Sequence, residues 1–128
     1  TALLQGFYHR ISTRNDVFFL DKDKNRRTAI RAKWWEDPIG KSYKEVCVKM
    51  EESYEHLTDL VPPEKAVYPI YGKNEKPVFF GHYWLEAEVP NLQTSNVCCL
   101  DYSVAKEGKL VAYRFEGEIN LNNNNFIW

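Results

Sequence analysis

Apolar residues in this chain occur in short runs of about four or five, of which 77–80 and 97–100 are the most continuous. Continuous apolar runs of this length are typical of buried β-strands that are covered on both faces. They are far shorter than the ~20 residues that a membrane-spanning helix needs. The pattern therefore predicts a fold of short strands around a core, with no membrane as a partner.

The composition limits the domain organisation and the partners further. The chain has 128 residues, enough for a single domain with one core, and 15% of them are aromatic, which argues against disorder. Lys and Arg together number 17 and Asp and Glu 18, so the formal net charge is −1 and no nucleic acid is expected as a partner. The chain starts at Thr1 without a segment typical of a signal peptide, and we expect a cytoplasmic location.

The three cysteines, Cys47, Cys98 and Cys99, do not suggest a disulfide framework, because their number is odd and two of them are adjacent. On a strand, the side chains of Cys98 and Cys99 would point to opposite faces. No CxxC motif or Cys/His cluster accompanies them, so a metal or redox role has little support. We expect buried, reduced thiols.

A β-hairpin and a helix are predicted in the N-terminal part. Residues 16–20 and 28–34 are the two strands, the second with a two-residue period, and 21–26 is a charged turn in which Asn25 can take a left-handed conformation. A helix follows, because an S-x-x-E capping box starts at Ser42. Apolar residues then recur at three- and four-residue spacing as far as Leu57, and the proline pair after it prevents the helix from continuing.

Three strands are predicted in the C-terminal part, over 77–80, 96–102 and 109–116, after a loop over 67–76. Glu107-Gly108 is the expected turn between the second and third strands, and the Asn run near the C-terminus is another polar turn. The predicted fold class is therefore α+β: a hairpin plus a capped helix, followed by a three-strand C-terminal sheet.

The candidate site is at Gly81-His82, where the apolar strand 77–80 ends. Glycine allows a sharp turn, so the His82 side chain can leave at the C-terminal end of the strand, where ligand sites collect in open sheets. Imidazole is a metal ligand and a proton-transfer group, although a Gly-His pair is also common in turns whose histidine is simply hydrogen-bonded. At the end of the next strand, Asp101 and Ser103 are expected to form a local turn hydrogen bond.

Three stretches, 77–84 (PVFFGHYW), 96–106 (NVCCLDYSVAK) and 109–118 (KLVAYRFEGE), closely resemble the C-terminal end of bacterial calcineurin-like metallophosphoesterases. The resemblance is to the branch related to phosphoprotein phosphatases and dinucleoside-tetraphosphate hydrolases. Residues 19–23 and 31–35 look like the insertion that these bacterial members carry.

The resemblance implies a place in an αββα sandwich, with a hairpin, helix and loop insertion over 1–76 and the C-terminal strands over 77–128. In that family two divalent metal ions (Mn, Fe or Zn) hold the hydroxide that attacks phosphorus. His82 matches the ligand histidine of the final Gly-His motif, and Trp84 stands where the wider superfamily has a second histidine. The implied function is a hydrolase that acts on a phosphoester or nucleotide-type substrate.

The other metal motifs of that family are missing from these residues. No Asp-x-His, Gly-Asp-x-x-Asp or Gly-Asn-His occurs in the sequence. One histidine cannot assemble a dinuclear site, so His82 is the only metal ligand assigned and no catalytic residue is assigned. We expect the chain to be the C-terminal portion of a metallophosphoesterase, inactive in isolation and without bound metal.

Two other hypotheses remain open. In the first, the chain is an interaction module that binds a protein or forms a homo-oligomer, because strands 78–80 and 97–100 would lack a partner sheet and expose apolar surface. In the second, it is an α+β domain without a site. Tyr83 and Trp84, beside His82, could stack a nucleobase, but packing in a core is the expectation for both.

Overall fold

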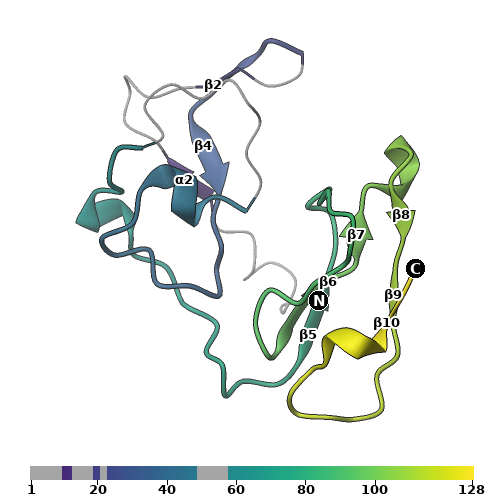
Figure 1. Cartoon of the computed structure of the whole chain (residues 1–128). Helices are drawn as coiled ribbons and strands as arrows, with labels where there is room; N and C mark the ends of the chain where they lie inside the picture. Colours follow the sequence, from purple (N-terminus) through teal and green to yellow (C-terminus); the bar gives the residue numbers. More distant parts are fainter. Residues whose placement is uncertain (1–9, 13–18, 21–22, 49–57) are drawn as a thin grey trace, which may run out of the picture. The chain divides into compact units, whose positions relative to one another are not determined.

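The computed structural model describes residues 10–12, 19–20, 23–48 and 58–128. The chain divides into two compact units, Thr1–Tyr71 and Gly72–Trp128, which are described separately (Figure 1). Short strands in small sheets and few helices make up both units, as expected for the α+β class. In the part of the chain that is described, no helix is long and apolar enough to cross a bilayer.

The described residues of the first unit form two strand pairs, neither of which has the partners that the sequence predicts. β2 (Phe19–Leu20) and β3 (Arg26–Arg27) pair antiparallel across the predicted charged turn. The alternating segment forms β4 (Ala29–Arg31), which pairs not with β2 but with β1 (Arg10–Ser12). A hairpin thus forms over 19–27, but its second strand lies at the end of the predicted turn, and the predicted pairing of 16–20 with 28–34 is wrong. The left-handed residue of the turn is Lys24, with φ 62°, and not Asn25.

Helix α2 (Tyr43–Val46) begins at the predicted capping box but is only one turn long. The Ser42 hydroxyl accepts from the Glu45 amide, and the Glu45 carboxylate accepts from the Ser42 amide. Cys47 is already extended and forms an antiparallel bridge with Ala32. The prediction that the helix continues through 47–48 is therefore wrong, because the backbone there pairs with the segment after β4. The remainder of the predicted helix, 49–57, lies outside the described residues.

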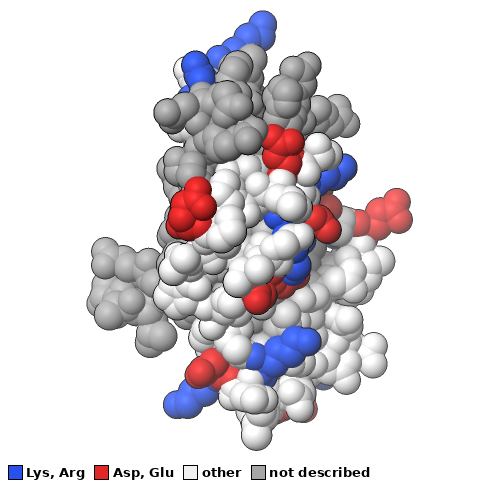
Figure 2. Space-filling model, turned by 90° about the vertical axis from the view of Figure 1, so that its left-hand side faces the viewer, with Lys and Arg blue, Asp and Glu red and all other residues white. Residues whose placement is uncertain are grey.

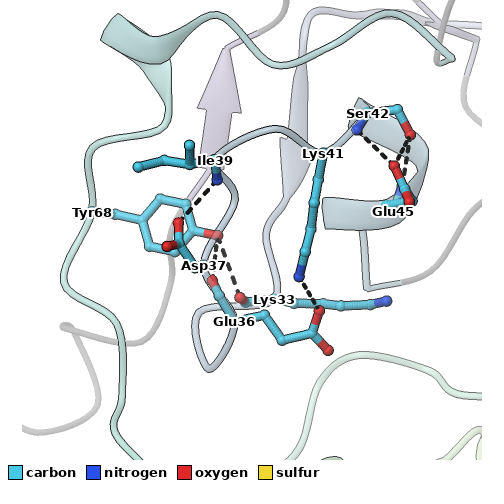
Figure 3. A network of polar contacts seen from close by, with 8 residues as sticks. All are labelled: Lys33, Glu36, Asp37, Ile39, Lys41, Ser42, Glu45 and Tyr68. Carbon is cyan, nitrogen blue, oxygen red and sulfur yellow. Dashed lines mark hydrogen bonds and ion pairs between the residues drawn. The ribbon is translucent and has the colours of Figure 1, made fainter.

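The core of the first unit is built from the alternating residues that the sequence indicates. Ile30, Ala32 and Trp34 are buried, and Ile30 and Ala32 pack with helix α2 and with residues of the 58–71 segment, which includes the 3-10 helix η1 (Pro63–Lys65). The Tyr68 hydroxyl donates to the carbonyls of Lys33 and Glu36 (Figure 3). Burial raises the pKa of Tyr68 to about 12. A side chain from the end of the unit thereby fixes the turn that follows β4.

The second unit contains three pairs of short strands. They are β5 (Val78–Phe80) parallel to β6 (Val97–Cys99), β7 (Asp101–Tyr102) antiparallel to β8 (Lys109–Leu110), and β9 (Ala112–Tyr113) antiparallel to β10 (Phe126–Ile127). The predicted strands 96–102 and 109–116 are each interrupted, at Leu100 and Val111, where the chain changes its pairing partner. The expected three-strand sheet is therefore wrong, although the strand positions are confirmed. The 3-10 helix η2 (Val104–Lys106) directly precedes the predicted turn at Glu107-Gly108, and η3 (Asn123–Asn125) lies in the Asn run.

The apolar strand β6 lies in the core of this unit. Val97, Cys98 and Cys99 are each 0% exposed, and Cys98 packs with Tyr102 and Phe126. The expectation that strands 78–80 and 97–100 leave apolar surface uncovered is wrong, since β5 is half-buried and β6 fully buried. Burial also raises the pKa of Cys98 and Cys99 to about 12. The buried, reduced thiols are thus confirmed, with Cys47 buried as well.

Candidate functional site

His82 lies where the sequence predicts it, in the loop directly after β5. Because β5 and β6 are parallel, their C-terminal ends meet at one edge of the pair. The loop passes the start of β7, where the Leu85 amide donates to the Asp101 carbonyl at 3.0 Å. The His82 side chain is exposed and not part of a core. The predicted position is confirmed; the role of His82 as a metal ligand stays a prediction.

The sharp turn at this position is made by His82 and not by the glycine before it. His82 and Trp84 have φ of 69° and 52°, in the left-handed region that favours glycine. Gly81 is not in that region, and a Cβ placed on it would meet only the Asp101 Cβ at 3.7 Å. The reason given for the turn from the sequence is therefore wrong. The unfavourable backbone conformation is therefore adopted by the candidate ligand His82 and by Trp84, two positions later.

The Asp101 carboxylate joins this loop to the residue that follows β7. One carboxylate oxygen accepts from the Trp84 amide at 3.1 Å, and the other accepts from the Ser103 amide at 3.1 Å. The second of these is the predicted Asp-x-Ser turn. The Ser103 hydroxyl donates to the Leu85 carbonyl at 3.0 Å. This is a further link between the same two segments, and here the donor lies on the β7 side. Two segments far apart in the chain are therefore joined at one carboxylate.

The aromatic residues beside His82 have different surroundings. Tyr83 is 4% exposed and packs edge-on against Phe80, with ring centroids 5.0 Å apart. The core packing expected for Tyr83 is thus confirmed. Trp84 is half-buried, and the Lys106 ammonium lies 4.4 Å from its ring centroid, in cation–π contact. Lys106 is a charged neighbour of the loop that no sequence motif indicates, because helix η2 alone brings it there.

The described residues do not contain a complete metal site. Across 10–12, 19–20, 23–48 and 58–128, no group of three or more His, Cys, Asp or Glu side chains could hold a metal ion. Both oxygens of the Asp101 carboxylate accept from backbone amides, and Cys98 and Cys99 are buried thiols with raised pKa values. His82 therefore fits as one ligand whose partners would have to come from outside these residues.

Comparisons with protein-family models, with curated proteins and with solved structures give no significant match. The resemblance to the metallophosphoesterases therefore stays a prediction from the sequence, strongest over 77–118.

Proposed function

We propose that this chain is the C-terminal portion of a metal-dependent phosphoesterase, a calcineurin-like hydrolase in which His82 is one ligand of a dinuclear metal site. The observation that carries the proposal is the exposed His82 at the C-terminal end of a parallel strand pair, of which β5 is half-buried and β6 fully buried. In this proposal the strands belong to an αββα sandwich, the metals are Mn, Fe or Zn, and the substrate is a phosphoester or nucleotide-type compound. The location is cytoplasmic.

A nucleic acid is not part of this proposal. On the face in Figure 2, Lys and Arg side chains are interspersed with Asp and Glu side chains. The net charge of the chain is −1. A mixed surface of this kind does not favour binding to a polyanionic backbone, which needs a concentrated basic patch.

The isolated chain should be inactive, because a dinuclear centre needs several ligands per metal and the described residues provide only His82. We expect no hydrolysis above buffer when the purified chain is incubated with Mn²⁺ and a chromogenic phosphomonoester or phosphodiester. Turnover that survives repurification but disappears in His82→Ala would contradict this expectation.

The parent activity is tested by the coding sequence upstream of these residues. We expect it to encode the Asp-x-His, Gly-Asp-x-x-Asp and Gly-Asn-His motifs in the same reading frame or in a separate adjacent gene. If neither is found, His82 has no partner ligands and the phosphoesterase proposal fails.

A second candidate function, self-association, is favoured by apolar surface on the outer side of the β8–β9–β10 region. Leu110 and Ile127 are 76% and 54% exposed. Ile127 pairs with Ala112, which is also exposed and lies two residues after Leu110. Trp128 and Ile119 are also exposed nearby in sequence. An apolar face of this kind is typical of a contact between protein chains.

Sedimentation of the chain over a wide concentration range tests this second function. We expect a dimer or larger species, and the double variant Leu110→Lys, Ile127→Lys should be monomeric because it places charge on the apolar face. The matched control, Val89→Lys with Val67→Lys, changes two other exposed apolar residues and should leave association unchanged. A wild-type chain that is monomeric at every concentration would rule the association out.

A further inference from the structure

We propose that Asp101 is the positioning residue for His82: its carboxylate holds the 81–85 loop in the conformation that directs His82 outward from the end of β5. The two hydrogen bonds involved, from the Trp84 and Ser103 amides to Asp101, are called the Asp101 hydrogen bonds below. The ligand role of His82 rests on the proposed function, whereas the Asp101 hydrogen bonds do not.

The first step concerns hydrogen-bond acceptors: the side chain at position 101 must provide two acceptor oxygens. Two backbone amides, 19 residues apart in the chain, donate to different oxygens of one side chain, each at 3.1 Å. An ionised carboxylate offers two acceptor oxygens and no donor, and hydrogen bonds to it are stronger than those to a neutral group. An amide side chain of the same shape offers only one acceptor oxygen, so it cannot serve both amides.

The second step is the backbone conformation that these bonds maintain. Three residues in this small region, His82, Trp84 and Ser103, have φ between 52° and 69° although none is glycine. Such conformations persist only where surrounding contacts determine them, and they cluster at functional sites. Trp84 and Ser103 donate their amides to Asp101, and His82 precedes Trp84 by two positions. Loss of the carboxylate should therefore allow the loop to relax to negative φ and turn the His82 side chain away.

The third step is that the contacts between the two segments act at different positions of the loop. The Ser103 hydroxyl bonds the Leu85 carbonyl, and the Leu85 amide bonds the Asp101 carbonyl, so these contacts hold the end of the loop. The Trp84 amide, two residues after His82, is held by the Asp101 carboxylate. Asp101 thus acts on His82 through the backbone and does not itself belong to the metal-ligand set.

The experiment compares Asp101→Asn with the matched control Glu107→Gln in the full 128-residue chain. Both variants convert one carboxylate to an amide, and Glu107 lies in the exposed turn after η2. We expect amide hydrogen exchange at Trp84 or Ser103 to accelerate by about tenfold or more in Asp101→Asn and to stay unchanged in Glu107→Gln. The strong intraresidue HN–Hα cross-peak that positive φ gives at His82 should weaken only in Asp101→Asn.

A merely structural role would give a different pattern. It would accelerate exchange equally at Leu121 and Arg114, whose amides bond Ser95 and Asn125 away from the loop. Equal acceleration at all four amides would therefore overturn the proposal, as would an unprotected Trp84 amide in the wild-type chain. If Asp101→Asn does not fold, Asp101→Glu keeps the charge but moves both oxygens, and the same local loss is expected. Missing metal motifs upstream would refute the phosphoesterase and leave the loop result standing.

Discussion

Gly108→Ala is expected to destabilise the Gly72–Trp128 unit by about 3 kcal/mol or more. A Cβ at this position would lie against the Tyr102 carbonyl oxygen, closer than real Cβ atoms approach, and 2.7 Å from two backbone atoms of Ser103. These neighbours are main chain of the β7 exit and cannot move aside like a flexible side chain. The turn is also closed by the Gly108 amide, which donates to the Ser103 carbonyl at 3.0 Å. An added methyl group must therefore separate β7 from β8.

Urea unfolding followed by the amide signals of Leu121 and Arg114 measures this effect within the correct unit. The matched control is Gly72→Ala, because a Cβ there would meet only the Glu75 Cγ at 3.8 Å, an ordinary contact with a flexible side chain. The control should change the free energy of unfolding by no more than about 0.5 kcal/mol. Equal unfolding midpoints for the two alanine variants would contradict the steric argument.

Signals that act over a few residues predicted this fold well. The capping box at Ser42 and Glu45 starts a helix, and the Asp101–Ser103 turn forms as expected. The turn at Gly108 is also where the sequence indicates it. In each case the interacting groups lie within a few residues, so their geometry is determined by local backbone chemistry.

Features that depend on distant partners could not be predicted in this way. Helix α2 ends at Cys47 because that backbone pairs with Ala32, although the apolar spacing favours further helix. β4 pairs with β1, which carries no strand signal of its own. Tertiary pairing overrides local propensity at both places, and no single-sequence pattern reports it.

The candidate site likewise combines features that the local sequence predicts with features that depend on distant contacts. The position of His82 follows from an apolar strand ending at a turn, which is a local signal. The bond from the Trp84 amide to Asp101 spans 17 residues, and the Lys106 contact with Trp84 depends on helix η2. The left-handed φ is at His82 itself and not at Gly81, which the sequence does not indicate.

Asn96→Ala is expected to cost about 3 kcal/mol of the free energy of unfolding of the same unit. Asn96 is 1% exposed, and its side-chain amide donates to the carbonyls of Gly72 and Glu75 at 2.8 and 3.0 Å. Its side-chain oxygen accepts from the Thr94 hydroxyl at 2.9 Å. Removing one side chain leaves three polar groups without this partner, and a buried polar group that loses its hydrogen bond costs about 1–3 kcal/mol.

The control for Asn96 is Asn91→Ala, since the Asn91 side chain is exposed and donates only to the nearby Val89 carbonyl. It should shift the free energy of unfolding by no more than about 0.5 kcal/mol. Asn96→Asp separates hydrogen bonding from volume, because it keeps the shape but turns a carboxylate toward two carbonyl oxygens. That repulsion raises the pKa of the new carboxyl, so stability should recover in part from about pH 7 to about pH 4, where a protonated carboxyl can donate. A loss in Asn96→Asp that is the same at both pH values would show that the donor bonds to Gly72 and Glu75 do not stabilise the loop before β5.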